Sequence, residues 1–322
     1  MNYEVPSLQK VEEELIRYYN LDTIKKVEYL GKSDNITFRI DMIKGKKYLL
    51  KLHMGAKSKR YIESELLWLE ELETNTDLKV QTPIRNINNQ FITKINDHKT
   101  GDHAYWTLQN WIKGETLKRQ PTDAEIEKLA HLLVTLHRNS LTWCVPETFE
   151  RPYYNAENLL NSLTQLKQLI SLHAITIDDF KILQKTTNKI ESVIHSQGKS
   201  KDAWGVIHSD IHESNYVMNQ GQPSIIDFSS CGFGYYLFDM AETLLHLSPN
   251  NREKFITYYQ KERKLEGDYT EVLEAFFIWA VIRNFAFLSK NRNEHNELAK
   301  STPFVVENFC RKYLNGERFL FN

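Results

Sequence analysis

The sequence has little cysteine, no long apolar run and almost no net charge. Cys144, Cys231 and Cys310 are the only cysteines among 322 residues, and their odd number and wide spacing favour reduced, structural thiols over a disulfide framework. The longest uninterrupted apolar run, 275–282, is far shorter than the roughly 20 residues that cross a bilayer. We therefore expect no membrane helix and no membrane partner.

Charge of neither sign dominates. The 41 Lys and Arg residues and 42 Asp and Glu residues give a formal net charge of -1. A nucleic-acid-binding protein usually carries a basic excess, so that partner class is not expected either. The polar, acidic start of the chain lacks the features of a signal peptide, which predicts a cytoplasmic protein. We also expect a monomer or a homodimer.

Two regions with different periodicity follow one another. Helical spacing of Leu8, Val11, Leu15 and Ile16 predicts an opening helix over 8–19. The next region predicts five strands and one inserted helix. The strands are expected at 27–31, 36–41, 47–53, 91–95 and 104–111, with a hairpin turn at Gly45, a polar separator at 97–102, and a helix over 61–73 whose stripe is Ile62, Leu66, Leu69 and Leu72.

Beyond Lys113 the pattern changes to long helices. They are expected at 122–137, where Thr122 and Asp123 are cap candidates, at 155–172 and at 177–196. The last 70 or so residues are helical in pattern and rich in aromatics. The aromatic stripe around Phe276, Phe277, Trp279, Phe285 and Phe287 is expected in the core.

The segment 204–240 interrupts the helices and carries most of the chemical information. An apolar strand delivers His208 and Asp210 into a loop, Asn215 follows five residues after Asp210, and a turn leads into a second strand that ends at Asp227. A hairpin of this kind brings three oxygen-bearing side chains to one end. Carboxylate and amide oxygens are ligands that Mg²⁺ prefers, so the pattern predicts a magnesium site at Asn215 and Asp227.

These residue types match what phosphoryl transfer requires. The reaction needs charge neutralisation, in-line positioning and a carboxylate that faces the attacking hydroxyl. Asp210 is the candidate that orients the hydroxyl proton. The spacing between Asp210 and Asn215 equals that of the protein-kinase catalytic loop, and Asp227 is followed by Phe as in the metal-binding motif of that family.

The strings HSDIHESN and IDFSSCGFGYYLFDMA resemble the catalytic segment of the aminoglycoside phosphotransferase and choline kinase superfamily. The matching positions are His208, Asp210, His212, Asn215, Asp227, Gly232, Gly234, Asp239 and Ala241. Ser209 stands where the family usually has glycine, which is tolerated at negative φ and strained at positive φ. Ser229 and Ser230 stand where many relatives carry an acid, and this leaves open whether one or two metal ions bind.

The resemblance implies an α+β, protein-kinase-like two-lobed fold. A small antiparallel β lobe, residues 1–111, would bind the nucleotide, and a larger, mostly helical lobe, 112–322, would hold the catalytic loop and the acceptor. The nucleotide would be ATP, with GTP not excluded, and the metal Mg²⁺. His208 would belong to the catalytic set by bracing the loop through hydrogen bonds, while Asp239 would bond to loop backbone.

The resemblance also implies roles in the small lobe. Lys51, inside the strand YLLKLH, would contact the α- and β-phosphates, and Glu65 of the following helix would pair with it, Glu63 being the alternative. The remaining candidates line the nucleotide: Gly31, Ser33 and Asn35 at the phosphates, and backbone atoms of Gln109, Asn110 and Trp111 at the adenine. HSDIH also looks like part of a zinc site, but no downstream His or Cys set completes one.

The acceptor is expected to be a hydroxyl of a small molecule: an antibiotic, an amino alcohol such as homoserine or choline, or a sugar. An aminoglycoside is a polycation, and the 12 Lys and Arg against 10 Asp and Glu in 251–322 do not suggest an acidic pocket. A Ser/Thr protein kinase with the same catalytic residues is the alternative. A nucleotide-binding pseudokinase is less favoured because Lys51, Asp210, Asn215 and Asp227 are all present.

Overall fold

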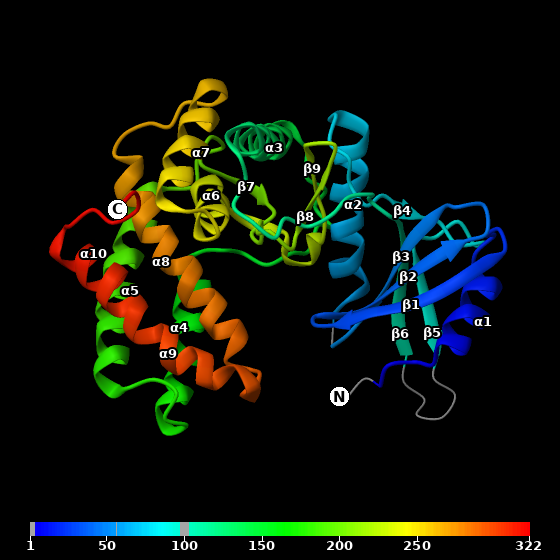
Figure 1. Cartoon of the computed structure of the whole chain (residues 1–322), viewed down its shortest axis with the longest axis horizontal. Helices are drawn as coiled ribbons and strands as arrows, with labels where there is room; N and C mark the ends of the chain where they lie inside the picture. Colours follow the sequence, from blue (N-terminus) through cyan, green and yellow to red (C-terminus); the bar gives the residue numbers. More distant parts are fainter. Residues whose placement is uncertain (1–3, 56, 97–102) are drawn as a thin grey trace. The chain divides into compact units, whose positions relative to one another are not determined.

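The computed structural model describes residues 4–55, 57–96 and 103–322 (Figure 1). The chain divides into two compact units. The first consists of Met1–Glu115, Trp143–Arg151 and Ser224–Ser229, and the second of Thr116–Thr142, Pro152–Pro223 and Ser230–Asn322. Two short segments from far along the chain therefore belong to the first unit. The separator predicted at 97–102 lies outside the described residues.

The first unit is built on a six-stranded antiparallel sheet in the order β1-β2-β3-β6-β4, with β5 also paired to β6. The strands are β1 Ile24–Lys32, β2 Asn35–Met42, β3 Lys47–His53, β4 Pro83–Ile84, β5 Ile92–Asn96 and β6 His103–Asn110. The predicted turn is confirmed, because Gly45 adopts φ +86° and its N–H donates to the Met42 carbonyl at 3.0 Å. The sequence predicted five of the six strands; β4, two residues with a proline, is too short to show alternation.

Two helices flank this sheet, α1 (Leu8–Tyr18) and α2 (Lys59–Asn75), and Figure 1 shows the sheet between them. The α2 stripe predicted from the sequence is buried in full. The α1 stripe is narrower than predicted: Val11 and Leu15 are buried in the core of the first unit, but Leu8 and Ile16 are exposed. Val11 and Leu15 lie one helix turn apart, and Tyr18 packs against the same core.

The second unit is mostly helical, and the three helices predicted at its start are confirmed. The helices are α3 Asp123–Thr142, α4 Ala156–Ser171, α5 Ile177–Gln197, α6 Tyr236–Leu245, α7 Pro249–Glu262, α8 Tyr269–Leu288, α9 His295–Val305 and α10 Lys312–Asn315, with a π-helical turn at Val306–Arg311 between the last two. The predicted capping of α3 is present, because the Thr122 N–H donates to Glu125 at 2.8 Å.

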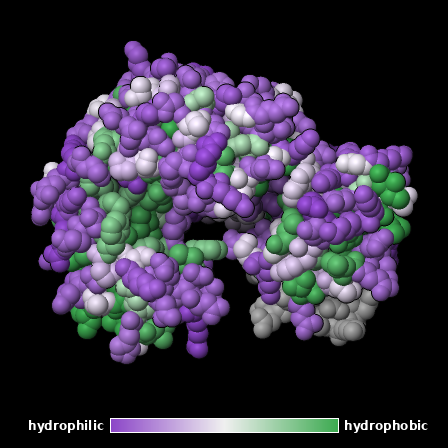
Figure 2. Space-filling view, in the orientation of Figure 1, coloured by the Kyte–Doolittle hydropathy of each residue, from purple (hydrophilic) through white to green (hydrophobic). Residues whose placement is uncertain are grey.

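Hydrophilic residues cover most of the molecular face that Figure 2 shows.

Helix α8 carries the predicted aromatic core. Phe276, Phe277, Trp279 and Phe285 are buried as expected, but Phe287 is 49 % exposed. Despite this apolar helix, none of the helices in the described part of the chain combines the length and apolarity that crossing a membrane requires.

Short strands carry the chemically informative segment. β7 (Trp204–Ile207) pairs antiparallel with β10 (Gly232–Tyr235), with Ile207 opposite Gly232. The loop 208–215 follows β7 directly. β8 (Tyr216–Asn219) and β9 (Gln222–Ile225) then form a two-stranded ladder, and the chain passes into the first unit within β9. Asp227 therefore belongs to the first unit, and Asp210 and Asn215 belong to the second.

Candidate active site

Lys51 lies at the centre of a buried charge cluster in the first unit. Almost every residue of β3 is buried, and Lys51 itself is 2 % exposed. Its Nζ lies 3.1 Å from Glu65 Oε1 on α2 and 3.0 Å from Asp227 Oδ1. The pairing of Lys51 with Glu65 rather than Glu63 is thus what the structure shows, since Glu63 pairs with Lys59 on the helix surface.

The cluster keeps all three of these groups charged. Burial alone would lower the pKa of Lys51, but the Asp227 and Glu65 carboxylates outweigh it and raise that pKa. Burial would likewise raise the pKa of Glu65 and of Asp227, but the Lys51 ammonium holds both pKa values below their ordinary range. A fixed cation and a fixed anion are therefore preorganised here before any ligand binds.

Asp227 is held in an unusual backbone conformation. Its φ is +58°, which a residue other than glycine seldom adopts. Its N–H donates to Gln81 Oε1 at 3.0 Å, and Ser229 Oγ donates to its Oδ1 at 2.6 Å. Arg151 is buried and stacked on the Tyr61 ring, and it donates to the carbonyls of Phe228 and Ser229, the two residues after Asp227. These contacts fix the direction of the Asp227 carboxylate.

The candidates predicted at the phosphates, Gly31, Ser33 and Asn35, lie where β1 turns into β2. Gly31 is the last residue but one of β1, and the Ser33 N–H donates to the Asn35 carbonyl at 3.0 Å. The Asn35 side chain is committed, because its Nδ2 donates to Ser229 Oγ at 2.9 Å and its Oδ1 accepts from Lys57 at 3.2 Å. Sequence reasoning missed Lys57, whose ammonium also reaches the Asp34 carbonyl. A lysine four residues beyond a strand carries no distinguishing pattern.

The predicted adenine-contacting segment ends β6. The Asn110 N–H donates to the Thr82 carbonyl at 2.8 Å, and the Trp111 N–H donates to the Lys47 carbonyl at 3.3 Å. Gln109 is fully buried, with its backbone opposite Leu49 in the sheet. The role of these three residues stays a prediction.

Asp210 and Asn215 form the core of the loop in the second unit. Asn215 Nδ2 donates to the Asp210 carbonyl at 3.0 Å and to its Oδ2 at 2.9 Å. The five-residue spacing lets the loop close on itself, as the Asn215 N–H also donates to the His212 carbonyl. The Asp210 side chain is 30 % exposed. A carboxylate oriented by a neighbouring amide and open to solvent is suited to accept a proton.

The start of this loop is braced by Asp239 on α6. The buried Asp239 carboxylate accepts from the His208 N–H at 3.0 Å and from the Ser209 N–H at 2.6 Å, so the expected role of Asp239 is confirmed. The His208 side chain is fully buried, and a catalytic role for it stays a prediction. Ser209 adopts φ +62°, which is the strained case for a residue other than glycine. Its Oγ donates to the Ser230 carbonyl at 2.8 Å.

Arg283 and Glu242 are site residues that sequence reasoning missed. Arg283 on α8 donates to the Ser209 carbonyl at 2.7 Å and to Glu242 at 2.8 Å, and lies 3.7 Å from Asp210 Oδ1. Burial raises the pKa of Glu242 to about 7 despite its arginine partner. One signal in the sequence could have pointed to Arg283: it directly follows the longest apolar run, and a charged side chain next to a buried segment needs a partner.

The predicted metal ligands each keep one oxygen uncommitted. Asn215 uses its amide nitrogen on Asp210, and Asp227 uses Oδ1 on Lys51 and Ser229. Within the described ranges no protein partner is found for Asn215 Oδ1 or Asp227 Oδ2. Hard oxygen donors of this kind fit Mg²⁺, which takes few protein ligands and completes its shell with water and phosphate. No group of three or more His, Cys, Asp and Glu residues suited to a metal occurs in the described residues.

Comparisons with known proteins agree with this geometry. The family model described as "Phosphotransferase enzyme family" matches residues 27–275. The amicoumacin kinase of Bacillus subtilis (strain 168) is 21% identical over 308 residues, which cover 88% of this chain and 87% of that protein.

Solved structures are similar over nearly the whole chain. A microcompartment-associated aminopropanol kinase has a TM-score of 0.84 at 18% identity, covering 98% of this chain and 100% of that one. An amicoumacin kinase in complex with AMP-PNP, Ca²⁺ and Ami has a TM-score of 0.78 at 17% identity, covering 98% and 95%. The predicted protein-kinase-like fold and the predicted enzyme class are thereby confirmed. The chain is a phosphotransferase, and it belongs to the phosphotransferase enzyme family.

Proposed function

We propose that the protein transfers the γ-phosphoryl group of ATP, with Mg²⁺, to a hydroxyl of a small molecule. The observation that carries the proposal is the pair of preorganised groups: the buried Lys51, Glu65 and Asp227 cluster, and the Asp210 carboxylate held by Asn215. The nucleotide-bound solved structure of a relative supports ATP as donor. Residues 1–111 would bind the nucleotide and 112–322 the acceptor.

In this proposal the residues of the chain divide the work. As the acceptor oxygen bonds to the γ-phosphorus, the bond from that phosphorus to the bridging oxygen breaks and ADP leaves. Asp210 accepts the hydroxyl proton, and Lys51 neutralises charge on the α- and β-phosphates. Asn215 and Asp227 would hold the metal, which supplies further neutralisation of phosphate charge when bound. Arg283 and Asn215 keep the Asp210 carboxylate aimed.

Amino alcohols are the first acceptors to test. The similar proteins include an aminopropanol kinase and an amicoumacin kinase. One partly exposed acidic group accompanies Asp210 in the second unit: Glu213, which is half exposed and lies 3.0 Å from His246 Nδ1. An ammonium group on the acceptor would be attracted by these carboxylates. An acceptor without positive charge gains nothing from them.

The deciding experiment is an acceptor screen with Mg·ATP, read by a mass gain of one phosphoryl group. Amino alcohols, aminoglycosides, sugars and amino acids with a hydroxyl form the panel, and GTP replaces ATP in a parallel series. For the acceptor found, Asp210→Ala is expected to lower turnover by roughly 10²-fold or more, because the proton acceptor is removed.

Asp178→Ala is the matched control, since Asp178 is 88 % exposed and forms an ion pair with Lys181 one helix turn away. It is expected to leave turnover unchanged. Undiminished turnover by Asp210→Ala contradicts the proposal. Labelled phosphate entering proteins of a cell lysate, with no small-molecule acceptor, would assign a protein kinase instead.

A further inference from the structure

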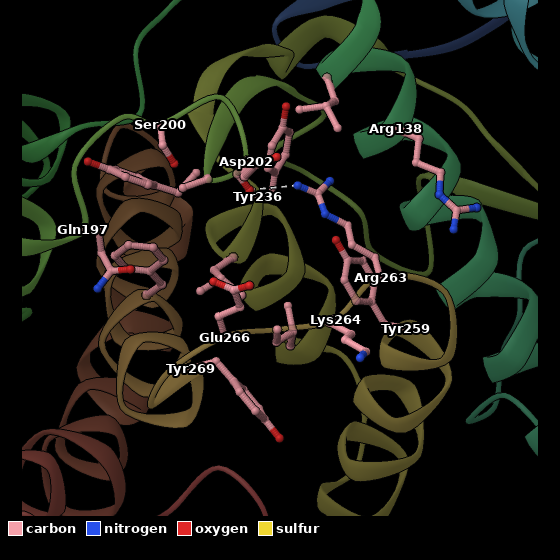
Figure 3. A pocket seen from close by; sticks show the side chains of 16 residues that line it. Arg138, Gln197, Ser200, Asp202, Tyr236, Tyr259, Arg263, Lys264, Glu266 and Tyr269 are labelled. Carbon is pink, nitrogen blue, oxygen red and sulfur yellow. Dashed lines mark hydrogen bonds between the residues drawn. The ribbon is translucent and has the colours of Figure 1, made fainter.

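A cavity of about 500 Å³ lies inside the second unit, away from the catalytic loop (Figure 3). It is lined by the ends of α3 and α7, the segment after α5, and the beginnings of α6 and α8. Tyr235, at the edge of the cavity, pairs with Trp204 at one end of the β7–β10 ladder, whereas the catalytic loop leaves from Ile207 at the other. The three residue steps from Trp204 to Ile207, about 10 Å, separate the two places.

Aromatic rings form part of the cavity wall, beside charged and polar side chains. The rings come from Tyr235, Tyr236, Tyr259, Tyr269 and Phe276. Aromatic walls around a volume of this size are typical of sites for small organic ligands.

The sheltered charge in the cavity is positive. Asp202 and Glu266 line it but are exposed, whereas Arg263 is partly buried. Arg138 also lines the cavity, but its charge is committed to Glu262, with an Nη1 to Oε2 distance of 3.0 Å. An anionic group in the interior would therefore meet Arg263 first.

Arg263 is incompletely satisfied. Its Nη2 donates to the Asp202 carbonyl at 2.8 Å, and its guanidinium stacks 4.4 Å from the Tyr236 ring centre (Figure 3). Its Nη1 is buried, and in the described part of the chain it has no hydrogen-bond partner. Nor does any described carboxylate form an ion pair with it. A buried guanidinium nitrogen without an acceptor raises the free energy of the folded state. An anionic ligand would accept from this nitrogen once the side chain turns toward it, and would remove that penalty.

The cavity is connected to the catalytic loop by hydrogen bonds. The Tyr259 hydroxyl lies 2.8 Å from His137 Nδ1, and His137 Nε2 lies 3.2 Å from Asp239 Oδ2. Asp239 in turn accepts from the N–H groups of His208 and Ser209. Burial lowers the pKa of His137, so the imidazole is neutral; its Nε2–H donates to Asp239, and the Tyr259 O–H donates to Nδ1.

A second line of contacts runs from Arg263 to the same strand. Its guanidinium covers Tyr236, whose hydroxyl lies 3.2 Å from Ser140 Oγ. That oxygen accepts from the Val206 N–H of β7 at 2.7 Å. Both lines lie within the second unit and end at the backbone that carries Asp210.

We propose that this cavity is an effector site for a small organic anion with an aromatic or otherwise apolar body. The anionic group pairs with Arg263, the body packs on the tyrosine rings, and occupancy is transmitted through Tyr259, His137 and Asp239 to the catalytic loop. The proposal does not depend on the identity of the acceptor.

The binding arm compares ligands that differ in charge. By ligand-observed NMR titration, 4-hydroxybenzoate or phenyl phosphate is expected to bind at least about tenfold more tightly than neutral 4-hydroxybenzamide, the effect of one charge-assisted hydrogen bond. Arg263→Gln is expected to abolish that preference, and Arg138→Gln, whose charge is already paired, to retain it. Leu265→Trp fills the cavity while leaving Arg263 in place, and is expected to abolish binding.

Each alternative result decides the question. No binding of either anion at millimolar concentration, or equal loss in Arg263→Gln and Arg138→Gln, overturns the site. Binding that persists in Leu265→Trp places the ligand elsewhere and overturns it as well. Circular dichroism and the unfolding midpoint establish that each variant is folded.

The coupling arm uses hydrogen exchange, which requires no knowledge of the reaction. The bound anion is expected to slow exchange of the His208 and Ser209 amides, because both donate to Asp239. Tyr259→Phe keeps the ring but removes the bond to His137, so the anion should bind and the slowing disappear. Tyr258→Phe, on the same helix but outside the cavity lining, should behave as wild type. Equal slowing in all three proteins overturns the transmission.

Discussion

At the residue scale, Lys51 shows how one side chain sets the protonation of its neighbours. It and Glu65 are almost completely buried, and removing one member of a buried ion pair leaves the other uncompensated. We expect Lys51→Met to lower the free energy of unfolding by about 3–5 kcal/mol, measured by urea titration. Lys47→Met, on the exposed start of β3, is the matched control and should change it by less than about 0.5 kcal/mol.

The loss in free energy of unfolding caused by Lys51→Met, called the deficit below, depends on pH because of the same contacts. In the wild type the lowered pKa values of Glu65 and Asp227 stabilise the fold above the ordinary carboxyl pKa, and this contribution is lost as the pH falls through the lowered values. Without Lys51, burial raises the pKa of Glu65, which favours the folded variant at low pH. The deficit should therefore shrink from about pH 8 to about pH 5. A deficit that grows over that interval would contradict this assignment.

At the element scale, the two glycines of the motif GFG are explained by packing. They lie on β10, where the strand is covered closely by β7 and by the segment around Pro152. A Cβ added at Gly232 would overlap the Pro152 carbonyl, a backbone atom that cannot turn away. At Gly234 it would overlap the end of the Ile207 side chain, which can move. The motif therefore maintains the strand that supports the catalytic loop.

Gly232→Ala is expected to destabilise the protein by about 3 kcal/mol, because overpacking against backbone forces the strand to shift. Gly234→Ala should cost less, since Ile207 can change rotamer. Gly31→Ala is the control: an added Cβ meets nothing within 4 Å there, and its φ is not positive. The unfolding midpoints of the three variants check the order. A Gly232→Ala protein as stable as Gly31→Ala would refute the packing explanation.

Elements with strong periodicity were predictable from sequence, and those without it were not. The α2 stripe repeats every three or four residues and is buried as predicted, whereas two-residue β4 has no period to detect. Within the site, Asp210 and Asn215 could be predicted because a fixed spacing in one loop brings them together. Arg283 could not, because its contact with Asp210 depends on how α8 packs, which local pattern does not encode.

At the scale of the whole molecule, the first unit is completed by chain that returns to it twice. Residues 143–151 supply Arg151, and residues 224–229 supply Asp227, the partner of Lys51. Hydropathy pattern placed both segments beyond the change to helices and gave no sign of this return. The catalytic motif predicts that Asp227 holds the metal at the phosphates, and the structure brings Asp227 to Lys51. That prediction rests on the chemistry of the reaction rather than on chain order.

The gain in free energy of unfolding on nucleotide binding should distinguish residues needed for binding from residues needed for phosphoryl transfer. At 100 times its dissociation constant, Mg·ATP is expected to add about 2.7 kcal/mol to the wild-type free energy of unfolding. Asp210→Ala should keep this gain, because Asp210 faces the acceptor in the proposed reaction. Asp227→Asn should lose most of it, since one metal ligand and the anion beside Lys51 are weakened together.

The gain of each variant is measured by thermal unfolding against that variant's own ligand-free midpoint, which removes differences in intrinsic stability. Asp178→Asn is the exposed-carboxylate control and should match the wild type. Repeating the series with EDTA should reduce the wild-type gain toward that of Asp227→Asn, because the phosphates then lack the cation that Asn215 and Asp227 would hold. If the wild type with EDTA and the Asp227→Asn variant both kept the full gain that the wild type shows with Mg·ATP, the nucleotide would bind without these oxygens. No gain in any protein would favour a module that does not bind ATP.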